Sequence, residues 1–337
     1  MRFGLVLPIQ AAGTPIAPLW DEVVAEAVAA EAAGFDAVFL PDFHQARGGS
    51  LTSPLLLGAA LLQATSTLRF GTSVLAAPLY HPARLAEDVA MLHQTSGGRF
   101  ILGVGPGHVP GHFDLFGVPH GGRGEALEQA LAALRRALAG EDVALDGPAH
   151  RGAGPVLAGA PPLDVPPVWI GAHGLRGVAR AGRLGDAWLS DPQRDVGTIG
   201  RLAEGYRAAA AAAGRVPAVA LFRDGWIDDS ERACRERWGP HALAVHRLYY
   251  NLGTYHRELE PWVDDVRDRA DFTFDRLAPG RFLVGDGPTV RATVADWHER
   301  TGAGYVAVRL RQPGGPGHRE TLQAIARFGA EVVSGPQ

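Results

Sequence analysis

The chain has 337 residues, a formal net charge of −4 and a hydrophobic content of 46%. This apolar content is sufficient for a sizeable core and argues against disorder. The charges form no basic stripe, so we expect no nucleic-acid partner. No apolar run approaches the roughly 20 residues that span a bilayer, so we expect no membrane partner. The single cysteine, Cys234, and an N-terminal segment too short for a signal peptide indicate a cytoplasmic protein.

The chain contains no lysine, and all 32 residues of the Lys and Arg class are arginine. A phosphate-binding P-loop requires a lysine, and so does the Schiff base that holds pyridoxal phosphate. The sequence therefore excludes both kinds of site.

Short apolar runs alternate with longer amphipathic stretches, which is typical of repeated βα units. We expect strands at 2–7, 36–40, 68–75, 99–104, 167–170, 186–189, 219–226 and 304–310. We expect helices at 21–33, 52–64, 83–95, 124–139, 175–183, 199–213 and 320–333, with Gly34 and Gly302 as helix stops. Eight such strands predict a closed (β/α)8 barrel in one domain, 1–337. A doubly wound open sheet is the alternative.

Two segments do not fit a minimal barrel. Residues 141–166 are rich in Gly, Pro and Ala and are interpreted as a long surface loop. Residues 230–282 lie between the seventh and eighth expected strands and carry Trp238, His246, Tyr249, Tyr250, Tyr255 and Trp262. Loops at this position of a barrel gather at the catalytic end, so we expect this insertion to lie over the mouth. By the mouth we mean the end of the barrel where the strands' C-terminal ends lie.

Glycine and histidine recur just past the expected strands, where functional groups of a parallel barrel belong. The candidates are Asp42, His44, Ser73, Val74, Gly105, Gly107, His108, Gly171, His173, Gly174 and Asp191. Glycine allows a ligand to approach the backbone closely. Histidine exchanges protons near neutral pH.

Residues 168–176 combine a buried strand, a tight turn and a helix start. Free N–H groups at that start, together with Arg176, indicate a phosphate site, although an ordinary βα turn explains the pattern equally well. Residues 103–108 lack the third glycine of a dinucleotide fingerprint, because His108 occupies that place, so we reject a nicotinamide site. No metal-binding or nucleophile-elbow motif is present. A glycosidase using Asp42 and Asp191 stays open.

Several motifs resemble the bacterial-luciferase-like family of flavin- and F420-dependent oxidoreductases. They are residues 67–74, His81-Pro82, 96–105, Phe116-Gly117, 167–171, 185–188 and 284–286. The resemblance implies a barrel that binds FMN or the deazaflavin F420 at its mouth. It implies a phosphate site at His173, Gly174, Leu175 and Arg176, and a cis peptide at Ser73-Val74 that supports the ring, with Gly105, Gly107 and Gly171 close by. We also expect a homodimer.

The chain departs from the family pattern at three places. Many relatives have Asp-His-Phe after the second strand, whereas this chain has Asp42-Phe43-His44, and a one-residue shift on a strand exchanges its faces. FMN enzymes of the family often have Arg where this chain has Pro106, and F420 enzymes often have Glu where it has His108. Residues 171–176 match the Gly-Ala-x-Gly-Pro-Lys pattern of F420 enzymes only in part. The motifs therefore do not decide between the two cofactors.

The leading hypothesis is an FMN-dependent monooxygenase that oxygenates a small organic substrate with O2, its reduced FMN supplied by a separate flavin reductase. We expect His44 to orient or protonate the oxygenating group and His108 to contact substrate or act as an acid, with Asp42 as the rival catalytic group. The alternative is an F420-dependent reductase or dehydrogenase that transfers a hydride. A flavin-binding barrel without catalysis is the third hypothesis.

Overall fold

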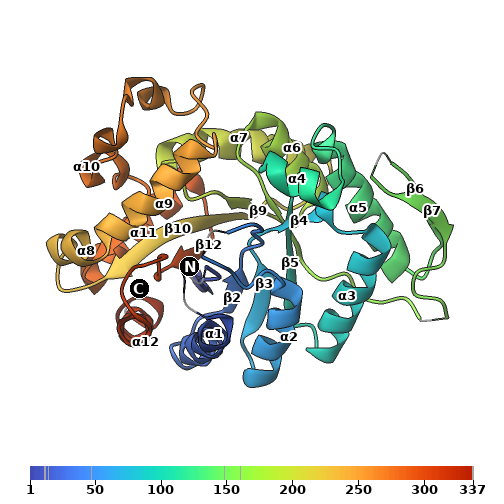
Figure 1. Cartoon of the computed structure of the whole chain (residues 1–337), viewed down its shortest axis with the longest axis horizontal. Coiled ribbons are helices and arrows are strands. Elements are labelled where there is room, and N and C mark those ends of the chain that lie inside the picture. Colours follow the sequence, from blue (N-terminus) through green and yellow to red (C-terminus); the bar gives the residue numbers. More distant parts are fainter. Residues whose placement is uncertain (11–12, 14, 47, 148, 160, 336–337) are drawn as a thin grey trace.

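The computed structural model describes residues 1–10, 13, 15–46, 48–147, 149–159 and 161–335. Its centre is a closed barrel of eight parallel strands (Figure 1). In order around the barrel these are β1 (Arg2–Val6), β2 (Ala37–Leu40), β3 (Arg69–Thr72), β5 (Phe100–Gly105), β8 (Val168–Gly171), β9 (Ala187–Ser190), β10 (Val219–Ile227) and β12 (Tyr305–Arg309). The pairing of β9 with β10 closes the ring. The predicted barrel is thus confirmed, and the open-sheet alternative is wrong.

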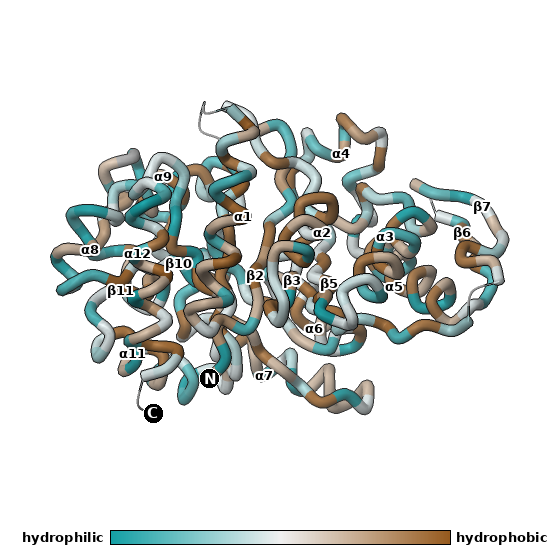
Figure 2. Tube along the Cα trace, turned by 90° about the horizontal axis from the view of Figure 1, so that it is seen from below, coloured by the Kyte–Doolittle hydropathy of each residue, from teal (hydrophilic) through white to brown (hydrophobic). Residues whose placement is uncertain are grey.

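Helices surround the barrel, and hydrophobic and polar residues alternate along them (Figure 2). They are α1 (Ile16–Ala32), α2 (Pro54–Ala64), α3 (Pro82–Thr95), α5 (Arg123–Leu138), α6 (Leu175–Leu184), α7 (Val196–Ala212), α11 (Gly287–Thr301) and α12 (His318–Phe328), the last followed by η4 (Gly329–Val333). Gly34 and Gly302 end helices as predicted, with positive φ angles of 81° and 66°. In the described part of the chain, no helix combines the length and the apolar character needed to cross a membrane.

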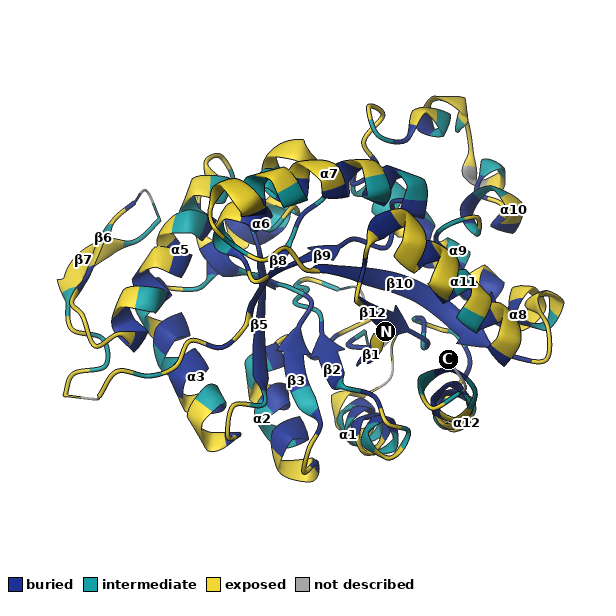
Figure 3. Ribbon diagram, turned by 180° about the vertical axis from the view of Figure 1, so that it is seen from behind, coloured by how far each residue is buried: buried dark blue, intermediate teal, exposed yellow. Residues whose placement is uncertain are grey.

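The expected loop at 141–166 contains an antiparallel hairpin of β6 (Val143–Asp146) and β7 (Arg151–Gly154). The hairpin extends from the side of the barrel and is mostly exposed (Figure 3). It was not predicted, because its strands are short and β7 reads Arg-Gly-Ala-Gly, which lacks the β-branched and aromatic residues typical of strands.

The segment 230–282 is largely helical. It contains α8 (Glu231–Arg237), α9 (Gly239–Asn251), η2 (Pro261–Asp265), η3 (Arg269–Asp271) and α10 (Phe274–Leu277), and β11 (Phe282–Gly285) then pairs with the end of β10. Its aromatic residues pack on one another: the rings of Tyr250 and Phe272 lie 5.0 Å apart, and those of Tyr255 and Trp262 lie 5.3 Å apart. These residues therefore form a small core for the segment.

The barrel interior is filled by inward-facing side chains. They are Val6, Ala37, Phe39, Ile101, Trp169, Ala187, Leu189, Ala220, Phe222, Tyr305 and Ala307. They follow the two-residue alternation of the strands, and the next inward positions toward the mouth are Asp191, Asp224 and Arg309. Because the interior is a packed core, we expect a ligand to bind above it, at the mouth.

Strands β3 and β5 approach each other unusually closely at Gly103. A Cβ placed on Gly103 would lie 1.7 Å from the carbonyl oxygen of Thr72. The Thr72 hydroxyl donates to the Gly103 carbonyl at 2.6 Å and accepts from its N–H at 3.0 Å. Only glycine fits at this position, because the group in the way is backbone and cannot rotate aside.

We expect Gly103→Ala to lower the free energy of unfolding by about 3 kcal/mol or more, the upper end of the usual cost of overpacking. Gly205→Ala is the matched control, because Gly205 lies within α7 and a Cβ there meets no atom within 4 Å. This control should gain about 1 kcal/mol from helix propensity. Urea denaturation of both variants measures the difference, and equal midpoints would contradict the close approach.

Candidate functional site

Val74 forms a small apolar platform at the centre of the mouth. The Ser73–Val74 peptide is cis, as the resemblance implied. Val74 packs on the apolar residues of the barrel interior. Its Cγ2 would lie 2.8 Å from a Cβ on Gly105 and 3.0 Å from one on Gly171, so the two glycines make room for it. The Oγ of Ser73 is buried and has no hydrogen-bond partner among the described residues.

Asp42 is held firmly just past β2 (Ala37–Leu40). Its Oδ2 accepts hydrogen bonds from the Ala76 N–H at 3.1 Å and from the Tyr80 hydroxyl at 3.2 Å. Its Oδ1 lies 3.3 Å from Nε2 of His44. Burial raises the pKa of Asp42, and His44 and the two hydrogen bonds offset part of this rise. The buried carboxyl group is therefore positioned to hold neighbouring groups rather than to meet a ligand.

His44 points into the protein at the β2 edge of the mouth, and only 13% of its side chain is exposed. Its ring lies 4.7 Å from the ring of Phe116 and 5.3 Å from that of His112. Both residues belong to α4 (Pro110–Phe116), a short helix after β5. The one-residue shift in the motif thus directs His44 toward Asp42 and α4, and not into solvent.

His108 lies beyond the end of β5 (Phe100–Gly105). It follows Gly107, which has a φ of 73° and whose carbonyl accepts a hydrogen bond from Nε of Arg123 at 3.1 Å. The surrounding protein lowers the pKa of His108 by desolvation, and the nearby His173, His112 and Arg123 lower it further. The residue keeps exposed surface, so water offsets part of this effect. His108 is therefore neutral at pH 7, which suits it to accept a hydrogen bond and not to act as an acid.

The start of α6 (Leu175–Leu184) is open. Gly174 is the N-cap residue, no side chain caps the helix, and its first turn contains no acidic residue. A Cβ on Gly174 would meet no atom within 4 Å. Leu175 is 68% exposed and Arg176 is exposed beside it. Free N–H groups, open space and an arginine make this helix start a suitable phosphate site.

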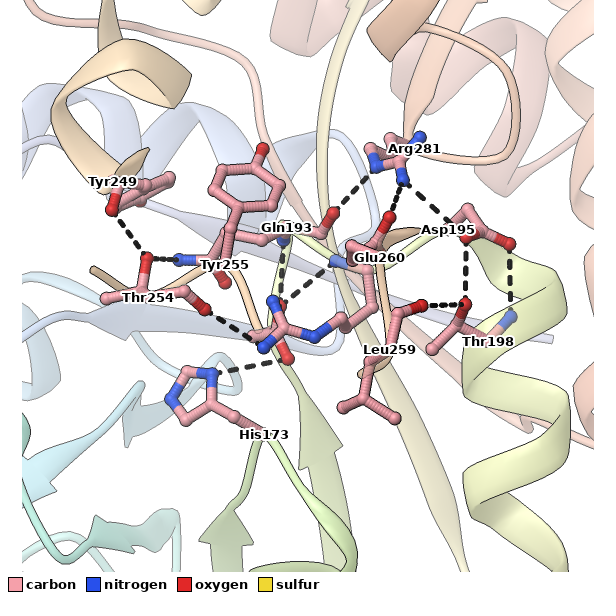
Figure 4. A network of polar contacts seen from close by, with 12 residues as sticks. His173, Gln193, Asp195, Thr198, Tyr249, Thr254, Tyr255, Leu259, Glu260 and Arg281 are labelled. Atoms are coloured by element: carbon pink, nitrogen blue, oxygen red, sulfur yellow. Dashed lines mark hydrogen bonds and ion pairs between the residues drawn. The ribbon is translucent and has the colours of Figure 1, made fainter. Parts of the chain in front are cut away.

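Behind this helix start, His173 contacts a buried carboxylate (Figure 4). Its Nδ1 lies 3.3 Å from Oδ2 of Asp191, just past β9, and the His173 ring lies 6.2 Å from that of His108. Burial acts to raise the pKa of Asp191, but Arg194, His173 and Arg223 outweigh it and hold that pKa well below its usual range. Asp191 is therefore ionised.

At the ends of β10 and β12, on the opposite half of the mouth, the charges are paired. Arg309 binds both carboxylate oxygens of Asp224, at 2.7 and 3.0 Å. His246 of α9 links this pair to the segment 230–282, with Nε2 3.0 Å from Asp224 and Nδ1 2.5 Å from the hydroxyl of Tyr255. Arg309 also donates to the Tyr249 hydroxyl at 3.1 Å. His246, Tyr249 and Tyr255 therefore serve the packing and hydrogen bonding of the protein itself.

The structure brings the predicted residues together in three groups. Val74, Gly105 and Gly171 form the centre, His44 and Asp42 lie at the β2 edge, and His108, His173 and residues 174–176 lie at the edge of β5 and β8. The sequence did not single out Tyr80, His112 or Arg194; the Phe116-Gly117 motif was the only signal for α4.

Asp42 and Asp191 are both buried, and each is bound by neighbouring groups of the protein, which removes the glycosidase hypothesis. Among the described residues, no three His, Cys, Asp or Glu residues are arranged to hold a metal ion.

A curated relative from Mycobacterium tuberculosis, described as an F420-dependent hydroxymycolic acid dehydrogenase, is 34% identical over 205 residues. The match covers 58% of this chain and 56% of the relative, so the chain spans about half of that protein's length. A second relative, the 4-hydroxyprotoasukamycin monooxygenase of Streptomyces nodosus subsp. asukaensis, is 30% identical over 32% of this chain and 29% of its own.

The fold matches that of a solved flavoprotein. The oxygenating constituent of 3,6-diketocamphane monooxygenase from Pseudomonas putida, solved in complex with FMN, superposes with a TM-score of 0.83. The match covers 98% of each chain at 20% identity, which establishes the fold alone. The sequence model of the family described as luciferase-like monooxygenase matches residues 1–304. This chain therefore belongs to the luciferase-like monooxygenase family, whose members include flavin monooxygenases and F420-dependent enzymes.

Proposed function

We propose that this protein is an FMN-dependent monooxygenase that uses reduced FMN and O2 to oxygenate a small organic molecule. One observation carries the proposal: the apolar Val74 platform packs on a filled barrel and shares the mouth with an open helix start and a largely buried histidine. This arrangement suits a flat ring with a phosphate at one end. The monooxygenase relative and the family's description support the oxygenating reaction.

The residues present fit a flavin. Val74 would support the ring, and Gly105 and Gly171 keep the space around Val74 free of side chains. The N–H groups at the start of α6, with His173 and Arg176, would bind the phosphate. When bound and reduced, the flavin supplies the electrons that activate O2.

The two histidines of the mouth would divide the proton chemistry. Asp42 lies beside Nε2 of His44, which leaves Nδ1 as the nitrogen that can exchange a proton, and no described residue bonds to it. His108, neutral at pH 7, would accept a hydrogen bond from the substrate. Phe116 and His112 pack on the ring of His44, and this packing would help to keep water away from the oxygenating chemistry.

An F420-dependent reductase or dehydrogenase is the second candidate. It is favoured by the relative with 34% identity, which is described as F420-dependent. The Val74 platform and the helix start suit a deazaflavin equally well, and the same histidines would serve a hydride transfer without O2. A separate flavin reductase remains a prediction of the first candidate, and a homodimer remains a prediction for either candidate.

We expect the purified protein to bind FMN or F420 and not NAD. The open start of α6 offers a phosphate site, while residues 103–108 lack the dinucleotide fingerprint. Fluorescence titration with the three ligands decides the matter. Binding of F420 alone would establish the second candidate, and binding of NAD without either flavin would overturn both. Tight FMN binding without turnover of any substrate or O2 would instead favour a non-catalytic flavin-binding barrel.

Arg176→Ala should weaken cofactor binding by about ten- to a hundredfold, because a charge-assisted hydrogen bond contributes about 1.5–3 kcal/mol. Arg176 is exposed and has no hydrogen bond to another described residue, so folding should be unaffected. Arg183→Ala, at the other end of α6, is the control and should bind like the wild type. Equal affinities of the two variants would place the phosphate elsewhere.

His44→Ala and His108→Ala test the proton chemistry. At least one of them should lower kcat by about 10²- to 10⁴-fold, the usual contribution of a general acid or base, while cofactor affinity is retained. His241→Ala on α9 is the control. The assay uses the first substrate that the wild-type protein turns over. Wild-type kcat in both single variants would remove the histidines from the mechanism.

A further inference from the structure

We infer that Asp191 is a positioning residue for the cofactor phosphate, acting through His173, whose Nδ1 lies 3.3 Å from its Oδ2. The inference rests on the proposed function, because it needs a cofactor that carries a phosphate. It adds a buried residue to a site that the sequence motif confines to residues 173–176.

Asp191 is fixed by the backbone that follows it. Its Oδ1 accepts the N–H groups of Gln193 at 2.9 Å and of Arg194 at 3.1 Å. These bonds leave Oδ2 directed at His173, 3.3 Å from Nδ1. The carboxylate is buried and lies on the inward face of its strand, so its position is set by the barrel and not by solvent.

Asp191 lies among buried arginines whose hydrogen-bonding capacity is not fully used. Nη1 of Arg194 lies 3.6 Å from Oδ1, and Nη1 of Arg223 donates to the Asp191 carbonyl at 3.0 Å. Nε and Nη1 of Arg194 are buried and make no hydrogen bond to any described residue. Asp195, Glu260 and Asp224 pair with Arg281 and Arg309 in the same cluster, so its charges are balanced. The unused donors include those of Arg194, behind His173.

His173 connects this cluster to the open helix start. Its side chain is 35% exposed, and its second ring nitrogen lies on the side away from Asp191 (Figure 4). The next residue, Gly174, leaves the space in front free. An imidazolium between two anions donates Nδ1–H to one and Nε2–H to the other, and both bonds are charge-assisted. Loss of a charge-assisted hydrogen bond to the phosphate should lower affinity by about 10–100-fold.

A double-mutant cycle tests the inference. The dissociation constant of FMN is measured by fluorescence quenching for the wild type, His173→Gln, Asp191→Asn and the double variant. Each single variant should lose about tenfold or more in affinity. The double variant should bind no more weakly than His173→Gln alone, because Asp191 acts only through His173.

Riboflavin, which lacks the phosphate, is the ligand control. Its affinity should be the same in all four proteins if the two residues act on the phosphate alone. Asp195→Asn is the matched protein control, because Asp195 caps α7 and contacts Arg281, and asparagine retains a cap. This variant should bind FMN like the wild type.

The outcomes separate this inference from the proposed function. If the wild type binds neither FMN nor F420, the proposed function fails and the inference fails with it. If the wild type binds FMN but His173→Gln binds it equally well, or if the two substitutions act additively, only the inference is overturned. If Asp191→Asn does not fold, the His173→Gln result with FMN and riboflavin decides. If only F420 binds, the same cycle is run with F420 and its phosphate-free deazaflavin.

Discussion

The close approach of β3 and β5 is the constraint on which the rest of the mouth depends. Gly103 has no room for a side chain, because the Thr72 carbonyl occupies the position of its Cβ. Gly105 and Gly171 continue the inward face toward the mouth without side chains, and Val74 fills the space they leave. Without these glycines, bulky side chains would occupy the place of the platform, and the packed interior would extend to the rim.

The mouth has two halves that differ in their electrostatics. On the side of β2, β5 and β8, the groups are apolar, neutral or only partly engaged, as Val74, His108 and the start of α6 show. On the side of β10 and β12, charges are paired and buried, as in the Asp224–Arg309 pair. The first half can exchange its contacts for a ligand, whereas the second half would lose stability if it did so. Asp191 and Arg194 lie where the halves meet.

Local patterns in the sequence predicted the barrel and the helix start, because each depends on residues close together in the chain. The strands of the barrel are apolar runs, and the turn at 171–176 is continuous. Strand β11 was missed because its first residue, Phe282, was assigned to the insertion 230–282, and the rest of the strand directly follows that segment. The environment of His44 was not predictable, because it is set by Phe116, 72 positions later. The role of Asp191 likewise required the adjacency of β8 and β9.

The segment 230–282 is attached to the barrel in a way that limits which of its residues can change during evolution. His246 and Tyr249 connect α9 to the barrel through buried hydrogen bonds to Asp224 and Arg309, and such bonds tolerate few substitutions. A mutation there that admits a new substrate would also weaken the fold. The short helix α4 and the exposed side chains of Leu115 and Leu175 make none of these buried hydrogen bonds. New substrate preferences should therefore arise on that rim first, where a change in shape leaves the scaffold intact.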